Sequence, residues 1–413
     1  MNLEIRPIWF PREDDPEPVP PPPPERVEAA VLGGGVAGLA TARELARSGV
    51  QVVLLEKGRP GRSATGRSDG QILLATGEHP SRLVGQLGPE RAALLFQAMA
   101  ENRDQVAALP PERTGWKASG GWRLAETPSE AAELEESAAW LASRGEEARF
   151  VGKEELQEEL PLLAGFHGAL HRPGEGLVHP LGLARALEEE ARSAGGEIHP
   201  GRAARSVSEG REGFQVAWED RRGERGTFSA QVVVLASSCA SRSLEPTGFA
   251  SRVLYPFRAQ ALATAPLPPS ALEGLPEAPM SSHFCYEYFR RHGGRIVVGG
   301  MRWSVPGEEV GIEDDASIHP KIHENLLAWT ARHLPAAVPV PAESAWTGIL
   351  CGTPDGLPLC GMVPGKGGLF LLAGFNGYGL SLAPALARTL AEQVLEGRSR
   401  RPWAVLFRPG RFA

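Results

Sequence analysis

The sequence predicts an α/β protein with two parts, a parallel sheet flanked by crossover helices and a second, mainly antiparallel sheet. A short apolar run at 29–32, a glycine-rich turn, a helical pattern and a second apolar run at 51–55 follow one another, which is the order of a βαβ unit. A continuous apolar run at 231–236 is typical of a parallel strand buried on both faces. Strands at 283–289 and 295–299 read as an antiparallel hairpin.

The first glycine-rich turn has the pattern G-x-G-x-x-G, formed by Gly33, Gly35 and Gly38. Gly33 permits the tight turn, Gly35 lets a pyrophosphate approach the backbone, and Gly38 lets helix and strand pack closely. Val36 and Ala37 open the helix, whose N-terminus offers free N–H groups and the positive end of its dipole to phosphates.

The second strand of this unit ends at Glu56, which Lys57 follows. An acidic residue at this point can accept hydrogen bonds from ribose hydroxyls. Strand, turn, helix and acid together predict a Rossmann-type dinucleotide-binding domain. The alternative is a glycine-rich turn that only packs.

Composition limits the classes of function. A chain of 413 residues with 42% hydrophobic residues can form two domains with their own cores. The net charge of -7 argues against a nucleic-acid partner. The 4 cysteines have no C-x-x-C spacing, so we expect neither a disulfide framework nor a metal site. We find no membrane span and no signal peptide, and therefore expect a cytoplasmic protein. Nothing in the sequence indicates the oligomeric state.

The dinucleotide-binding domain is expected to be discontinuous, because the βαβ pattern resumes after an intervening stretch. The expected division is a proline-rich N-terminal tail at 1–27, a dinucleotide-binding domain at 28–110, 170–245 and 342–400, a substrate domain at 111–169 and 246–341, and a C-terminal tail at 401–413. Proline runs supply neither strand nor helix to a core. We therefore expect residues 1–24 to be dispensable for cofactor binding.

The remaining elements are expected from periodicity and turn signals. Helices are expected at 83–109, 129–144, 181–194 and 380–395, and strands at 119–124, 197–207, 214–218, 342–350 and 369–373. The polar, glycine-rich stretch at 57–78 is expected to be a loop whose N–H groups reach a flat ligand. A second glycine-rich turn, 374–379, opens the last helix, so a second helix N-terminus could face the same cofactor.

Five ordered motifs resemble one family of flavoenzymes. They are the first glycine turn with Glu56, the loop Ser63–Gln71, Val178–Leu181 before a helix, the strands Tyr288–Arg290 and Arg295–Gly300, and the stretch from Trp346 through Thr353-Pro354-Asp355-Gly356 to Gly361. Over nearly the whole chain they resemble the D-amino-acid-oxidase (DAO) superfamily of FAD enzymes, and most of all its γ-glutamylputrescine oxidase branch. The resemblance implies a glutathione-reductase-like DAO fold, in which the antiparallel sheet covers the flavin.

The resemblance also implies which residues contact FAD. They are Gly33, Gly35, Val36, Ala37, Gly38, Glu56, Lys57, Thr65, Gly66, Arg67, Ser68, Gly70, Gln71, Ile72, Ala204, Ala236, Gly348, Gly374, Asn376, Gly377, Tyr378, Gly379 and Leu380. Relatives with covalent flavin use a cysteine where this chain has Gly348, and Cys351 is out of register. We therefore expect non-covalent FAD.

The reaction implied by the resemblance is loss of hydride from an amine-bearing carbon to flavin N5, hydrolysis of the imine, and reoxidation by O2 to give H2O2. Tyr288 is the candidate that orients the amine, Arg290 a possible anion clamp, and Tyr378 a residue that closes the pocket. For Tyr288 the alternative is a packed strand aromatic, and for Arg290 a solvent-facing turn residue.

Two departures bear on the substrate. Amino-acid-oxidising relatives often carry arginines where this chain has Leu350 and Gly377. Their absence argues against a small α-amino acid held by a bidentate arginine. We expect a small amine or amino-acid-like substrate whose amine is far from any carboxylate, or that has none. Three alternatives stay open: a dehydrogenase of the same fold, a flavin monooxygenase, and a catalytically silent flavoprotein.

Overall fold

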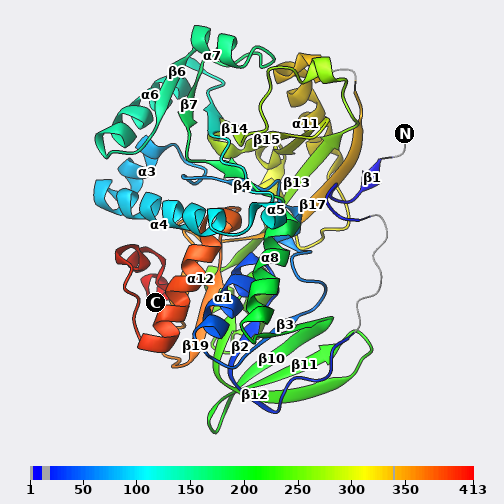
Figure 1. Cartoon of the computed structure of the whole chain (residues 1–413), viewed down its shortest axis with the longest axis vertical. Helices are drawn as coiled ribbons and strands as arrows, with labels where there is room; N and C mark the ends of the chain where they lie inside the picture. Colours follow the sequence, from blue (N-terminus) through cyan, green and yellow to red (C-terminus); the bar gives the residue numbers. More distant parts are fainter. Residues whose placement is uncertain (1–2, 12–18, 338–339) are drawn as a thin grey trace.

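The computed structural model describes residues 3–11, 19–337 and 340–413. Its strands form two large sheets and one two-stranded ribbon, and Figure 1 shows the two sheets as the lower and upper parts of the molecule. The predicted two-part α/β architecture is confirmed. Part of the proline-rich stretch, 12–18, lies outside the described residues.

The lower sheet has the order β10-β11-β12-β2-β3-β9, with β19 beside β12 and β18 beside β19. Its strands are β2 (Arg26–Leu32), β3 (Val52–Glu56), β9 (Glu197–Pro200), β10 (Arg202–Gly210), β11 (Gly213–Asp220), β12 (Arg225–Leu235), β18 (Leu359–Met362) and β19 (Leu369–Ala373). The central pairs β12–β2, β2–β3 and β3–β9 are parallel. Because both faces of β2 and β3 are covered, residues 29–32 and 52–55 are all apolar and buried.

Helices α1 (Val36–Arg47), α8 (Pro180–Ser193) and α12 (Gly379–Glu396) cover one face of this sheet side by side (Figure 1). Leu39, Leu45 and Ala46 of α1 belong to the buried apolar cluster on this face of the sheet. The N-termini of α1 and α12 lie at the upper edge of the sheet, where the parallel strands end. Ligands bind at this edge in open α/β sheets.

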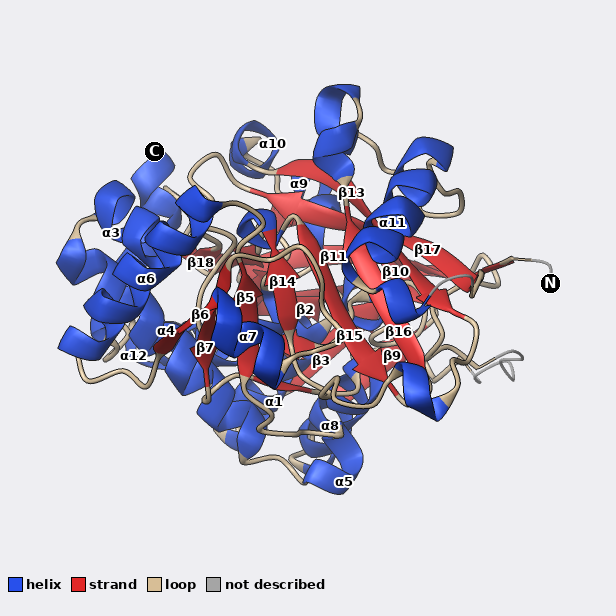
Figure 2. Cartoon of the chain, turned by 90° about the horizontal axis from the view of Figure 1, so that it is seen from above, coloured by secondary structure: helices blue, strands red, loops and turns tan. Residues whose placement is uncertain are grey.

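The upper sheet has the order β1-β17-β13-β16-β15-β14-β5-β7-β6. Its strands are β1 (Glu4–Ile5), β5 (Gly121–Leu124), β6 (Arg149–Gly152), β7 (Gly168–Arg172), β13 (Tyr255–Thr264), β14 (Met280–Ser282), β15 (Glu287–His292), β16 (Arg295–Gly300) and β17 (Ala342–Gly352). Only the pairs β1–β17 and β14–β5 are parallel. Helix α11 (Pro320–His333) packs on β13 and β16, and Figure 2 shows it above the strands.

The remaining elements connect the sheets. They are the ribbon β4 (Gln71–Ile72) with β8 (Gly176–Leu177) and the helices α2 (Ala64–Arg67), α3 (Pro80–Leu87), α4 (Pro89–Ala107), α5 (Pro111–Thr114), α6 (Pro128–Ser143), α7 (Lys153–Glu159), α9 (Ser241–Leu244) and α10 (Phe249–Val253). No helix within the described residues is long and apolar enough to cross a membrane.

Several expected elements are divided in the structure. The helix expected at 83–109 is interrupted at Gly88, which adopts φ +80° before Pro89. The strand expected at 197–207 splits at Gly201, with φ +70°, into β9 and β10. The stretch 283–285 was expected as strand but forms a 3-10 turn with positive φ. The stretch 57–78, which was expected to be a loop, contains the short helix α2 and strand β4. Its high glycine content did not indicate either element.

The two expected tails pack onto the body. In the N-terminal stretch β1 pairs with β17, and Trp9 is buried beside Trp346, with ring centres 5.9 Å apart. In the C-terminal stretch Trp403 and Phe407 are fully buried. In the part that the structure describes, the expected N-terminal tail therefore packs on the body, and whether residues 1–24 are dispensable for cofactor binding stays a prediction. Strand β17, assigned to the nucleotide part, lies in the upper sheet. The domain boundaries stay a prediction.

Candidate cofactor and substrate site

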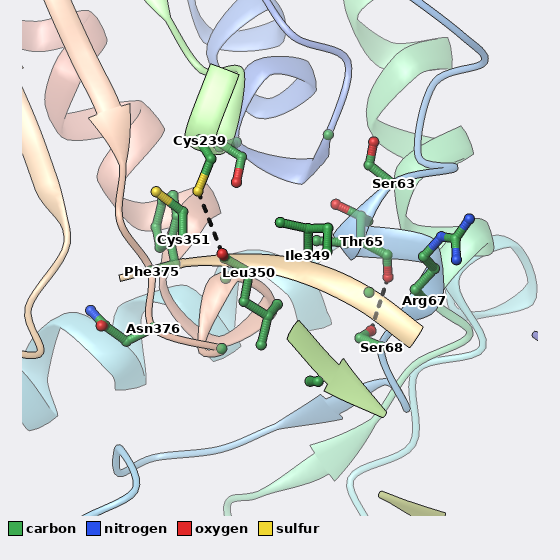
Figure 3. Close-up of a pocket in the computed structure, with 18 of the residues that line it drawn as sticks. Ser63, Thr65, Arg67, Ser68, Cys239, Ile349, Leu350, Cys351, Phe375 and Asn376 are labelled. Atoms are coloured by element: carbon green, nitrogen blue, oxygen red, sulfur yellow. Dashed lines mark hydrogen bonds between the residues drawn. The ribbon is translucent and has the colours of Figure 1, made fainter. Parts of the chain in front are cut away.

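A cavity of about 860 Å³ lies between the two sheets, at the upper end of the ~300–1,000 Å³ typical of ligand pockets. Its wall runs from the first glycine turn and Glu56, past the loop 63–71, to the aromatic residues of the upper sheet. Figure 3 shows a part of this wall formed by the loop, the end of β17 and the second glycine turn.

The first glycine turn forms an open cradle at the N-terminus of α1. A side chain at Gly38 would overlap the carbonyl of Gly33, so Gly38 serves the packing of helix and strand. A Cβ at Gly35 would have only the Thr65 hydroxyl within 4 Å, at 3.3 Å. The Val36 N–H donates to that hydroxyl, 3.0 Å away. The Gly35 side of the turn is thus open to the cavity, which fits the pyrophosphate of a dinucleotide.

Glu56 is buried and held by two backbone groups. Its Oε2 accepts from Gly34 N–H at 2.7 Å and its Oε1 from Gly58 N–H at 2.8 Å. A carboxylate oxygen has two lone pairs, so each oxygen can accept a further hydrogen bond. Glu56 and Ala204 both border the cavity, and the Glu56 carboxylate fits a ribose hydroxyl.

The loop 63–71 is clamped to the upper sheet. Arg67 Nη1 donates to the carbonyls of Thr347, at 2.6 Å, and Asp315, at 3.1 Å. The Arg67 carbonyl accepts from Trp346 Nε1 at 2.8 Å. Gly70 adopts φ +86°, and a side chain there would overlap the Val178 carbonyl. The loop therefore crosses the cavity in one fixed conformation.

The second glycine turn is fixed by Asn376, which adopts φ +52°. Its N–H donates to the Cys351 carbonyl at 2.9 Å, and its Oδ1 accepts from Thr353 N–H at 3.1 Å. The turn thus holds the N-terminus of α12 at the cavity. Tyr378 is the N-cap residue of this helix, and its side chain makes no capping hydrogen bond. The uncapped N–H groups can stabilise negative charge on a ligand.

Most of the expected cofactor residues border the cavity. Those that do are Gly33, Gly35, Val36, Ala37, Glu56, Lys57, Thr65, Arg67, Ser68, Gln71, Ala204, Ala236, Gly348, Gly374, Asn376, Gly377, Tyr378, Gly379 and Leu380. Gly38, Gly66, Gly70 and Ile72 do not border it and support the residues that do. The donors, the buried carboxylate and the cavity fit FAD, and the contact of each residue with it stays a prediction.

Tyr288 and Tyr378 line the opposite end of the cavity, which we call the substrate end. The Tyr288 ring covers Gly299 of the neighbouring strand, where no side chain would fit. Burial raises the pKa of both tyrosine hydroxyls, and the charge of Asp69 raises that of Tyr288 further. Both hydroxyls are therefore neutral at ordinary pH and can donate to an amine nitrogen.

Arg290 does not border the cavity. It is buried, and its Nη1 donates to the carbonyls of Asp69 at 2.9 Å and Val178 at 3.1 Å. These bonds make Arg290 a support for the loop that faces the cavity. These bonds argue against both roles expected for Arg290, the anion clamp and the solvent-facing turn residue.

Sequence reasoning missed the carboxyl group of Asp69, which borders the cavity. Its Oδ2 accepts from Gln71 Nε2 at 2.6 Å, and the same amide also reaches the carbonyls of Met280 and Phe289, each at 3.2 Å. Burial raises the pKa of Asp69. The loop motif places this residue on the cavity, but no local pattern reveals its burial.

Other missed residues come from turns of the upper sheet. Phe284, Cys285 and Arg302 border the substrate end. Phe284 and Cys285 both adopt φ +57°, a conformation that non-glycine residues seldom adopt. Strand periodicity does not predict such turns, so the only available signal was their position at the ends of the expected hairpin.

Two cysteines also border the cavity, Cys239 after β12 and Cys351 in β17 (Figure 3). Cys239 Sγ donates to the Leu350 carbonyl at 3.5 Å. A hydrogen bond from the Cys351 thiol lowers the pKa of Cys239, while that bond and burial raise the pKa of Cys351. Within the described residues no group of three or more metal-binding side chains is found.

The comparisons with known proteins agree with this site. The family described as "FAD dependent oxidoreductase" (DAO) matches residues 28–393. Glycine oxidase of Geobacillus kaustophilus is 29% identical over 89% of this chain and 93% of its own, and that of Pseudomonas aeruginosa is 30% identical over 91% and 95%. Gamma-glutamylputrescine oxidoreductase of Escherichia coli is 24% identical over 91% and 84%.

The crystal structure of the Geobacillus glycine oxidase matches with a TM-score of 0.76 and 26% identity, over 92% of this chain and 98% of its own. The DAO fold and the FAD cofactor expected from the motifs are confirmed. The chain belongs to the DAO family of FAD-dependent oxidoreductases.

Proposed function

We propose that this FAD-dependent oxidoreductase oxidises a carbon–nitrogen bond of a small amine or amino-acid-like substrate, that the imine product is hydrolysed, and that O2 accepts the electrons to give H2O2. When bound, FAD supplies the hydride acceptor, ring atom N5. The relatives named glycine oxidase and gamma-glutamylputrescine oxidoreductase support this class of reaction.

One observation supports the proposal most directly: the dinucleotide cradle and an aromatic substrate end belong to the same cavity. The pyrophosphate region at Gly35 and the tyrosines at 286, 288 and 378 border one continuous space. A cofactor held at the cradle therefore shares this space with a substrate that lies against the upper sheet.

The protein's own residues would bind and orient the amine. Only a neutral amine has the lone pair that assists loss of hydride. The hydroxyls of Tyr288 and Tyr378 stay protonated because their pKa values are raised, and a neutral amine can accept a hydrogen bond from either. Phe284 and Leu350, both half-buried at the cavity, would limit water around the reacting carbon.

The test is product analysis with the yellow holoprotein in air. We expect primary or secondary amines to give H2O2 and an aldehyde or keto product in equal amounts, with one O2 consumed for each. If the enzyme turns over only with an added electron acceptor, it is a dehydrogenase and not an oxidase. Oxygen consumption that requires NADPH and gives a hydroxylated product would contradict the proposal.

A further inference from the structure

Arg302 brings a cation to the substrate end. It follows β16, at the start of a one-turn 3-10 segment, and borders the cavity. Its guanidinium carbon lies 4.8 Å from the ring centre of Phe257 and 5.3 Å from that of Tyr286. Both distances are within the range of cation–π attraction. The two rings fix the guanidinium on the cavity wall.

Part of the Arg302 guanidinium is not hydrogen-bonded to the portion of the protein that the structure describes. Nη1 donates to Glu308, at 3.0 Å from Oε2 and 3.2 Å from the carbonyl. Among the described residues, neither Nε nor Nη2 of Arg302 has an acceptor within hydrogen-bond distance. The side chain keeps 23% of its surface exposed. Two parallel N–H donors on one edge of a guanidinium match the two oxygens of a carboxylate.

The backbone around Arg302 is held in an uncommon conformation. Met301, just before it, adopts φ +61°, and Glu308 adopts φ +49°. The Met301 N–H donates to the Tyr286 carbonyl at 3.1 Å, and Glu309, next to Glu308, accepts from the buried Arg258 at 2.5 Å. Non-glycine residues persist in this region only where the surrounding structure enforces it, and such positions cluster at ligand sites.

The cation lies beside an apolar surface. Phe257 and Leu350 are direct partners across β13 and β17, so their side chains share one face of the sheet. Leu350 in turn lies 3.8 Å from the position of a Cβ at Gly377. The substrate end thus has an apolar part at Leu350 and Gly377 and a cationic part at Arg302, separated by the ring of Phe257.

We propose that Arg302 binds a carboxylate of the substrate, so that the substrate is an amine that also carries a carboxylate. The statement that the amine reacts rests on the proposed function, whereas the anion site rests on the geometry of Arg302. The proposal refines the sequence-based expectation, which named Arg290 as the anion clamp and looked for the carboxylate-binding arginines of relatives at positions 350 and 377. The alternative is a structural pair of Arg302 with Glu308.

The test is binding of acetate and benzoate to the oxidised holoprotein, followed by the change that each causes in the visible flavin spectrum. We expect Arg302→Gln to raise both dissociation constants by about tenfold or more, as for loss of a charge-assisted pair. Glu308→Gln, which removes the competing carboxylate, should lower them. The control is Arg192→Gln, because Arg192 pairs with Glu188 on α8 and does not border the cavity; this variant should leave both dissociation constants unchanged.

Arg302→Lys keeps the charge without the fork and should give intermediate constants, which covers the case that Arg302→Gln does not retain flavin. Unchanged constants in Arg302→Lys and Glu308→Gln would overturn the proposal, as would a wild-type protein that binds neither carboxylate. Because no turnover is involved, carboxylate binding that depends on Arg302 would stand even if no amine reduced the flavin. That combination would contradict the proposed function alone.

Discussion

The two ends of the cavity are built from different kinds of structure. The cofactor end uses mainly one continuous stretch, 33–71, and its contacts are backbone N–H groups and one carboxylate. The substrate end uses side chains from segments far apart in the sequence, at 257, 284–288, 302, 350 and 378. The cofactor, which many enzymes share, is expected to be held by local backbone geometry. The substrate, which differs between enzymes, is expected to be held by side chains that long-range packing brings together.

The largest expected effect is at the cofactor end. Gly35→Val places a side chain in the open cradle, so the protein should fold but purify without FAD. The ratio of flavin to protein absorbance measures this. Gly85→Ala, at a helix position with free space around it, is the control and should keep full flavin. A yellow Gly35→Val protein would show that the pyrophosphate lies elsewhere.

Trp9 tests how far the upper sheet depends on distant segments. It is 7% exposed and packs against Trp346, whose indole N–H holds the loop carbonyl of Arg67. Trp9→Ala should lower the free energy of unfolding by about 3 kcal/mol, as for other buried aromatic truncations. Denaturant titration of the holoprotein measures it, with Val405→Ala at an exposed residue as control. A loss similar to that control would mean that the N-terminal stretch is dispensable after all.

Glu56 should contribute less to FAD binding than the open glycine turn at Gly35. Glu56→Ala removes the acceptor for Gly34 and Gly58 and the expected ribose contact, and should weaken FAD binding by roughly 1–3 kcal/mol. Titration of apoprotein with FAD gives the dissociation constant. Glu28→Ala, at an exposed acid of β2, should leave it unchanged. An effect as large as that of Gly35→Val would indicate that Glu56 holds the turn itself.

Tyr288 should have a smaller effect, confined to the substrate end. Tyr288→Phe removes one neutral hydrogen-bond donor and should slow anaerobic flavin reduction by about tenfold, with the flavin spectrum unchanged. Reduction at the wild-type rate would leave Tyr288 as a packed strand aromatic.

The pH dependence of reduction separates the amine from the tyrosines. The rate should rise with pH as the bound amine loses its proton. Because burial raises the pKa of Tyr288 and Tyr378, ionisation of these hydroxyls should not lower the rate up to their ordinary pKa of about 10. Stopped-flow absorbance over this range measures it. A fall in rate in wild type that Tyr288→Phe removes would show that Tyr288 ionises early.

The contrast between the two ends also explains what the sequence could predict. Gly33, Gly35 and Glu56 lie in one βαβ unit, so their spacing places them together. Arg302 and Asp69 are brought to the cavity by αL turns and by the pairing of β13 with β16 and β17, and local periodicity does not contain that information. The contact of Trp9 with Trp346 is likewise made between segments that are distant in the sequence.

Non-covalent attachment of FAD stays a prediction, and the two cavity thiols make it worth testing. Acid precipitation should release all flavin into the supernatant, because position 348 is glycine. Flavin that remained on the polypeptide would point to Cys239 or Cys351, which both border the cavity. Serine variants of each would then identify the attachment site.

The most direct test of the central claim is anaerobic reduction of the bound flavin by a panel of amines, because it requires that cofactor and substrate share one cavity. We expect an amine that carries a carboxylate to bleach the visible flavin band in a single exponential phase whose rate saturates with concentration. Such an amine should act faster than the same amine without the carboxylate. If no primary or secondary amine bleaches the flavin while dithionite does, the account of this protein as an amine-oxidising enzyme is contradicted.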